Sequence, residues 1–280
     1  MLHRFAAPLF ALACGLSLAA GPVIAQELPS PEDQLFAALQ LPEIIAVMRS
    51  EGIAYGAKIG ADLFPGAVDS DWSAQVELIY DTGRMTDQAR AAFRAELAGA
   101  DIAPMLAFFI TEPGASFAAL EVSARTAMLD PSVDAASKEI AALASAENTP
   151  RFQLVQRFAR ANDLIDTNVV AAMNSNYAFY LGLMDGGAAQ PGVTEAEVLA
   201  SVWEQEAQIR DTTTEWVTSF LLMAYQPLPD ADIEAYIAFS ETPAGAALNQ
   251  AVFTAFDGMF VDISRALGVA SARYMVGDTL

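Results

Sequence analysis

The sequence predicts an all-α protein of roughly ten to twelve helices, arranged as two related helical halves. Apolar residues recur at three- and four-residue spacings along most of the chain, which is typical of amphipathic helices. We find no convincing alternating strand, no Asn-Gly hairpin and no strand–helix–strand rhythm. A helix–Pro–helix corner also occurs twice, about one hundred and thirty residues apart.

The two corners read DIAPMLAFFITEPGASFAAL and DADIEAYIAFSETPAGAAL, and each contains a Phe four residues before a Pro. Proline has no N–H to continue a helix but fits the first turn of a new one. Each corner should therefore end one helix and begin another. The residues that define the corners are Phe109 and Pro113 in the first copy and Phe239, Pro243 and Gly245 in the second.

Residues 1–25 have the pattern of a secretory signal peptide. Arg4 supplies a positive charge, Phe5 to Ala20 is apolar but short for a membrane span, and cleavage is expected near Ala25. Lipid anchoring at Cys14 is disfavoured because the preceding residues depart from the usual lipidation pattern. We therefore predict a periplasmic or secreted protein with no stable membrane span after cleavage.

Cleavage would remove the only His and the only Cys of the chain, His3 and Cys14. A mature chain without imidazole or thiol disfavours the common zinc sites, disulfides and Ser-His-Asp triads, so we expect no metal site and no cofactor. The formal net charge of −21 disfavours nucleic acid as a partner, because phosphate contacts need a basic face.

Helix starts and stops divide the remaining chain into halves at 26–147 and 148–280. Caps are expected at Ser30, Thr86, Thr149 and Thr194, the last in a capping box with Glu197. The expected helices cover 31–40, 42–64, 71–80, 86–97, the first corner, 132–146, a helix after Pro150, 166–184, a helix after Thr194, a helix through Trp216, the second corner and a long helix to about Gly268. Gly52, Gly56 and Gly60 lie on one face of the second helix, where we expect a neighbouring helix to pack closely.

At the corners, in FFITEPGASF and AFSETPAGAAL, the chain resembles the uncharacterised bacterial family DUF2059. The second copy has Gly two residues after Pro, at Gly245, whereas the first has it directly after Pro, at Gly114. The resemblance covers about sixty residues per copy and implies an exported helical protein. It implies nothing about chemistry.

Two groups of side chains are candidates for a functional site. The first is a polar and aromatic cluster that either forms a hydrogen-bond network between helices or lines a ligand or partner groove. Its members are Asn174, Asn176, Tyr177, Tyr180, Trp203, Glu206, Arg210 and Trp216. The second group is Glu121 and Arg125, which are four residues apart and are expected to form a structural ion pair.

These features favour a non-enzymatic exported module that binds another molecule, and an envelope protein is the kind of partner that such a module would meet. The first alternative is a binder of a small ligand or cation. The second is a carboxylate-based hydrolase that acts on envelope glycan, which would need two acids facing each other across a cleft. The sequence names no catalytic residue.

Overall fold

A computed structural model describes residues 29–64, 70–188 and 192–276. Within these ranges the chain is built from α-helices joined by short turns and has no strand, so the all-α prediction is confirmed. The predicted signal peptide at 1–25, with Cys14 and the cleavage site near Ala25, lies outside the described residues.

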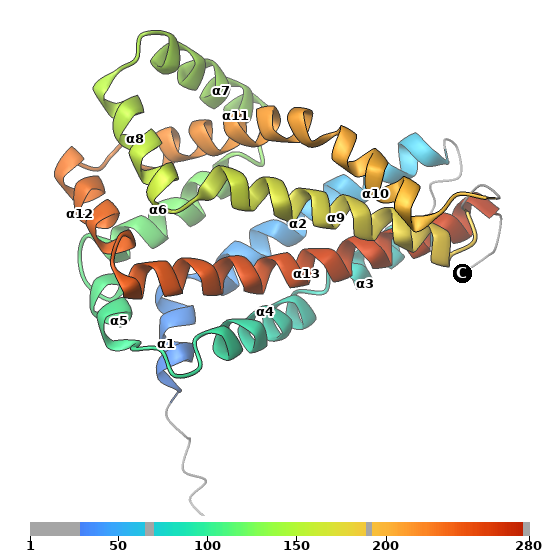
Figure 1. The fold of residues 1–280 in the computed structure, drawn as a ribbon, viewed down its shortest axis with the longest axis horizontal. Helices are drawn as coiled ribbons and strands as arrows, with labels where there is room; N and C mark the ends of the chain where they lie inside the picture. Colours follow the sequence, from blue (N-terminus) through green and yellow to red (C-terminus); the bar gives the residue numbers. More distant parts are fainter. Residues whose placement is uncertain (1–28, 65–69, 189–191, 277–280) are drawn as a thin grey trace, which may run out of the picture.

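The helices follow one another with turns of a few residues (Figure 1). They are α1 (Pro31–Ala38), α2 (Leu41–Leu63), α3 (Ser70–Ile79), α4 (Thr82–Glu96), α5 (Ala103–Phe109), α6 (Gly114–Ala127), α7 (Pro131–Ala146), α8 (Pro150–Ala161), α9 (Leu164–Asp185), α10 (Glu195–Glu204), α11 (Glu206–Ala224), α12 (Asp230–Ser240) and α13 (Pro243–Val276).

Side-chain caps set several of the helix starts. Ser30, Thr149 and Thr194 accept hydrogen bonds from the first turns of α1, α8 and α10, and Thr194 forms the expected capping box. The expected cap at Thr86 is wrong. Asp81 caps α4 instead, because its carboxylate accepts the free N–H of the first turn.

Both corners break where the sequence predicts, between α5 and α6 and between α12 and α13. The residues that take the same structural position in the two corners are Gly114 and Gly245, and not the prolines before them. A Cβ at Gly114 would lie 2.2 Å from the carbonyl oxygen of Phe108, and one at Gly245 would lie 2.2 Å from that of Phe239. The rings of Phe108 and Phe239 stack with centroids 4.4 Å apart, so the two corners touch each other.

Replacing either corner glycine with alanine should destabilise the fold. We expect Gly114→Ala and Gly245→Ala each to lower the free energy of unfolding by about 2 kcal/mol, because the new methyl group meets a backbone carbonyl. Urea unfolding measures this loss. Gly83→Ala is the control, since its Cβ would approach only the Asp81 side chain at 3.3 Å. Equal stabilities of the two corner variants and the control would contradict the close approach of the corner glycines to the carbonyl groups.

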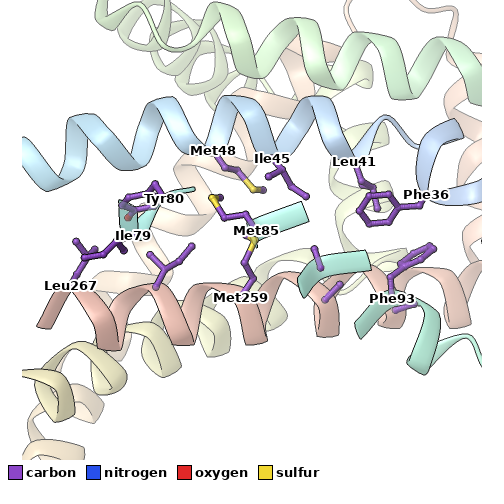
Figure 2. Close-up of a cluster of buried hydrophobic side chains, with 14 of the residues drawn as sticks. Phe36, Leu41, Ile45, Met48, Ile79, Tyr80, Met85, Phe93, Met259 and Leu267 are labelled. Atoms are coloured by element: carbon purple, nitrogen blue, oxygen red, sulfur yellow. The ribbon is translucent and has the colours of Figure 1, made fainter. Parts of the chain in front are cut away.

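The apolar core has two main clusters. The first joins α1 to α5 with α13, and Figure 2 shows Met48, Met85 and Met259 from α2, α4 and α13 facing one another inside it. The second joins α6, α7, α8, α11 and α12. Helix α13 completes the core of the first helices, so the two clusters do not follow the predicted division into 26–147 and 148–280. That division stays a prediction.

Helix α13 is the longest helix and lies between α9 and α4 (Figure 1). It does not end at Gly268 as expected. Gly268 instead lets α9 approach, since a Cβ there would lie 2.1 Å from the carbonyl oxygen of Phe179. Gly182 on α9 faces it, and its own Cβ would lie 2.2 Å from the carbonyl oxygen of Arg265. The small residues thus let the two backbones touch.

The glycines of α2 pack as expected where the structure describes them. A Cβ at Gly52 would overlap the Tyr80 ring, and one at Gly56 would overlap Val76, so α3 and its C-terminal end lie directly on this face.

Among the described helices, none alone has the length and apolar composition to cross a membrane. One bent pair, Ala103–Phe109 with Gly114–Ala127, meets that test across its 65° bend.

Candidate functional site

A cavity of about 330 Å³ lies among α2, α6, α8, α9, α11, α12 and α13. Its walls are mainly apolar side chains, including Phe253, Phe256 and Phe260 of α13, with polar side chains between them. The polar side chains that line it are Glu121, Arg125, Asn162, Asn168, Tyr225, Tyr236, Ser240, Asn249 and Asp257.

Glu121 brings a carboxyl group into this cavity from α6. It lies on the same helical face as Phe117 and Ala124, which are both buried, so the helix carries it inward with the core residues. The hydroxyl of the fully buried Tyr225 donates a hydrogen bond to Glu121 Oε1 at 2.6 Å. Burial raises the pKa of Glu121 to about 7, although the Tyr225 hydrogen bond opposes this rise.

The expected ion pair between Glu121 and Arg125 is not formed. Arg125 instead makes a two-pronged contact with Glu51 of α2, with Nε 3.0 Å from Oε1 and Nη2 2.8 Å from Oε2. The guanidinium also lies 5.5 Å from the centre of the Trp216 ring, which stacks on Phe220. Spacing along α6 puts both groups one turn apart, but the packing of α2 on α6 decides which carboxylate Arg125 meets.

The two tyrosines near the Glu121 carboxyl, Tyr225 and Tyr236, belong to a cluster of aromatic rings. Tyr236 of α12 has its ring centroid 4.6 Å from that of Phe117 and 4.8 Å from that of Phe158. Tyr225 packs edge-on against the same two phenylalanines. Burial, with the nearby charge of Glu121, raises the pKa of Tyr225 and of Tyr236 well above the usual value, so both phenols stay neutral.

Several polar atoms at the cavity have few partners. The Ser240 hydroxyl is buried and lacks a hydrogen-bond partner among the described residues. Asp257 of α13 is approached by the Asn174 side-chain amide at 3.2 Å. Asn249 donates to the carbonyl oxygen of Asn162 at 2.6 Å. An unpartnered buried hydroxyl is costly, and a bound molecule would be one way to satisfy it.

The structure does not gather the sequence-predicted cluster into one groove. Of its eight members, only Trp216 lines the cavity, and Asn174 reaches its edge through Asp257. Glu206 pairs with Arg210 at 2.7 Å, and Arg210 also reaches Asp166 of α9. These contacts tie α9 to α11.

The remaining members of that cluster lie on the surface or between helices. Tyr177 packs on the small apolar cluster of α9 and α10, and Asn176 is half-buried beside it in the chain. Tyr180 is 37% exposed and Trp203 is 61% exposed. The cavity is therefore lined by Trp216 but by neither Trp203 nor Tyr177.

Sequence reasoning did not single out Tyr225 or Tyr236 for the site. A signal for Glu121 exists in the sequence, because it stands four residues after Phe117 and three before Ala124 on a face that is otherwise apolar. No comparable local signal identifies the two tyrosines, which reach Glu121 from helices about one hundred residues further along the chain.

Two further observations concern possible metal ligands and known relatives. In the described ranges, no group of three or more His, Cys, Asp or Glu side chains is placed to hold a metal ion. Comparison with known proteins gave no match, whether to family models, to curated proteins or to solved structures. The resemblance to DUF2059 at the corners therefore stays a prediction, and the site must be interpreted from its own geometry.

Proposed function

We propose that this protein is an exported, non-enzymatic binding protein that holds a small, mainly apolar molecule in the cavity between its helices. The observation that carries the proposal is the cavity itself. Its volume of about 330 Å³ lies within the range of small-molecule sites, and its walls combine apolar side chains with a few convergent polar groups.

The polar groups have the properties of a ligand site. A well-packed core satisfies or excludes its polar atoms. Here Glu121 is held in a largely apolar wall with a raised pKa, and the Ser240 hydroxyl has no partner in the described part of the chain. Perturbed titratable groups gather at functional sites more often than elsewhere. These features support a ligand site over a packing defect.

The cavity supports a hydrolase acting on glycan less well. A raised carboxyl pKa, as at Glu121, is typical of a general acid, and Asp257 lines the same cavity. Sugars, however, need many hydrogen-bonding side chains, and most of the lining residues are apolar. The chemistry of the walls therefore favours retention of an apolar molecule over recognition of a polar glycan.

Filling the cavity should abolish binding. Ala171 of α9 lines the cavity, so Ala171→Phe places a ring inside it. We expect the protein to take up the neutral apolar fluorophore N-phenyl-1-naphthylamine with increased emission, and the variant to lose at least tenfold in affinity. Fluorescence titration measures both. Val170→Phe is the matched control, because Val170 is 56% exposed on the same helix. Equal uptake by both variants would contradict the proposal.

A further inference from the structure

The charge of Glu121 has no basic partner inside the described fold. Arg125 is the nearest candidate by sequence, and both of its contacting nitrogens are engaged by Glu51. The only hydrogen bond to the carboxyl group among the described residues comes from the neutral Tyr225 hydroxyl. A buried carboxylate without a counterion is costly, and this cost leaves the group about half protonated near pH 7 in the empty protein.

The other titratable groups that line the cavity leave a negative excess in it. Tyr225, which directly follows α11, and Tyr236 on α12 are neutral. The positive charge of Arg125 on α6 is balanced by Glu51 on α2. Asp257 on α13 is a second acid in the lining, and it accepts a hydrogen bond from the neutral amide of Asn174. An anionic ligand would meet both acids, whereas a cation would neutralise one.

Resting on the proposed function, we propose that the ligand is an amphipathic organic cation whose protonated amine lies against the Glu121 carboxylate and whose apolar part lies along α13. The rings of Phe158 and Tyr236, with centroids 4.8 Å apart, line the cavity near this carboxylate. Aromatic faces stabilise organic cations as well as apolar chains. The net charge of −21 would also concentrate cations around the protein.

Three eight-carbon compounds that differ only in the head group test this assignment. Octylammonium, octan-1-ol and octanoate are used to displace N-phenyl-1-naphthylamine from the purified protein. Alkylamines titrate near the lysine value of about 10.4, so octylammonium stays charged at both about pH 8 and about pH 5.5. At the higher pH we expect octylammonium to bind about tenfold more tightly than octan-1-ol and octanoate to bind most weakly. At the lower pH the advantage of the amine should largely disappear, because Glu121 is then protonated.

Two variants distinguish the effect of the Glu121 carboxylate on binding from the effect of the protein's overall charge. Glu121→Gln should bind octylammonium no more tightly than octan-1-ol at both pH values. Glu215→Gln removes one charge from an exposed position on α11 and should keep the preference for the amine. Equal binding of all three compounds by the parent, or tightest binding of octanoate, would overturn the assignment and leave the proposed function standing. Failure of the protein to take up either the fluorophore or octan-1-ol would overturn both.

Discussion

Gly268→Ala is expected to lower the free energy of unfolding by about 3 kcal/mol, the largest loss from any single methyl group that we predict. The new Cβ would lie 2.1 Å from the carbonyl oxygen of Phe179, 2.9 Å from the Cα of Gly182 and 3.0 Å from the backbone nitrogen of Leu183. These are backbone atoms of α9 and cannot rotate away, so α9 and α13 must move apart. For a chain of this size the melting temperature should fall by about 6 to 10 °C.

The same helix provides a control for Gly268→Ala. Gly258 also lies within α13, and a Cβ there would meet no atom within 4 Å. Since alanine favours helix over glycine, Gly258→Ala should be neutral or stabilising by about 1 kcal/mol. Thermal and urea unfolding of the two variants can be compared directly. Similar behaviour of both variants would contradict the close approach of α9 and α13.

Glu121→Gln is expected to act in the opposite direction and to stabilise the protein at high pH. The folded pKa of about 7 lies above the ordinary value of 4.5, so between these values the folded state holds a proton that the unfolded state has released. Stability then falls as pH rises through this window. Above about pH 7 the buried charge should cost about 3 kcal/mol, and glutamine removes this cost while still accepting the Tyr225 hydrogen bond.

The difference in unfolding free energy between Glu121→Gln and the parent is the quantity to measure. It should be near zero below about pH 4.5 and should grow to about 3 kcal/mol above about pH 7. Taking the difference cancels the repulsion among the other acids, which also changes with pH in this acidic chain. A constant difference across this range would show that Glu121 has an ordinary pKa. A residue that weakens the fold while facing a cavity is typical of a functional site.

Features that depend on neighbours in the sequence were predictable. The all-α class, both corners and the caps at Ser30, Thr149 and Thr194 follow from spacing and local hydrogen bonding, and the structure confirms them. The predicted end of α13 at Gly268 was wrong, because glycine serves equally to end a helix and to let another backbone approach. Local pattern does not distinguish these two uses.

The site was less predictable, because its contacts join residues far apart in the chain. Glu51 lies 74 residues before Arg125, and Tyr225 lies 104 residues after Glu121. A spacing of four residues correctly places Glu121 and Arg125 on one face of a helix but does not show what that face meets. Around Asn176 and Tyr177 the sequence pattern pointed to a candidate site, but in the structure these residues contribute to the packing and surface of α9.

The most direct test of the account is a crystal structure of the protein grown with octylammonium at about pH 8, above the folded pKa of Glu121. We predict electron density inside the cavity, with the nitrogen within hydrogen-bonding distance of Glu121 and the carbon chain against Phe256 of α13. An empty cavity, or walls that have closed together so that no space remains beside Glu121, would contradict the account.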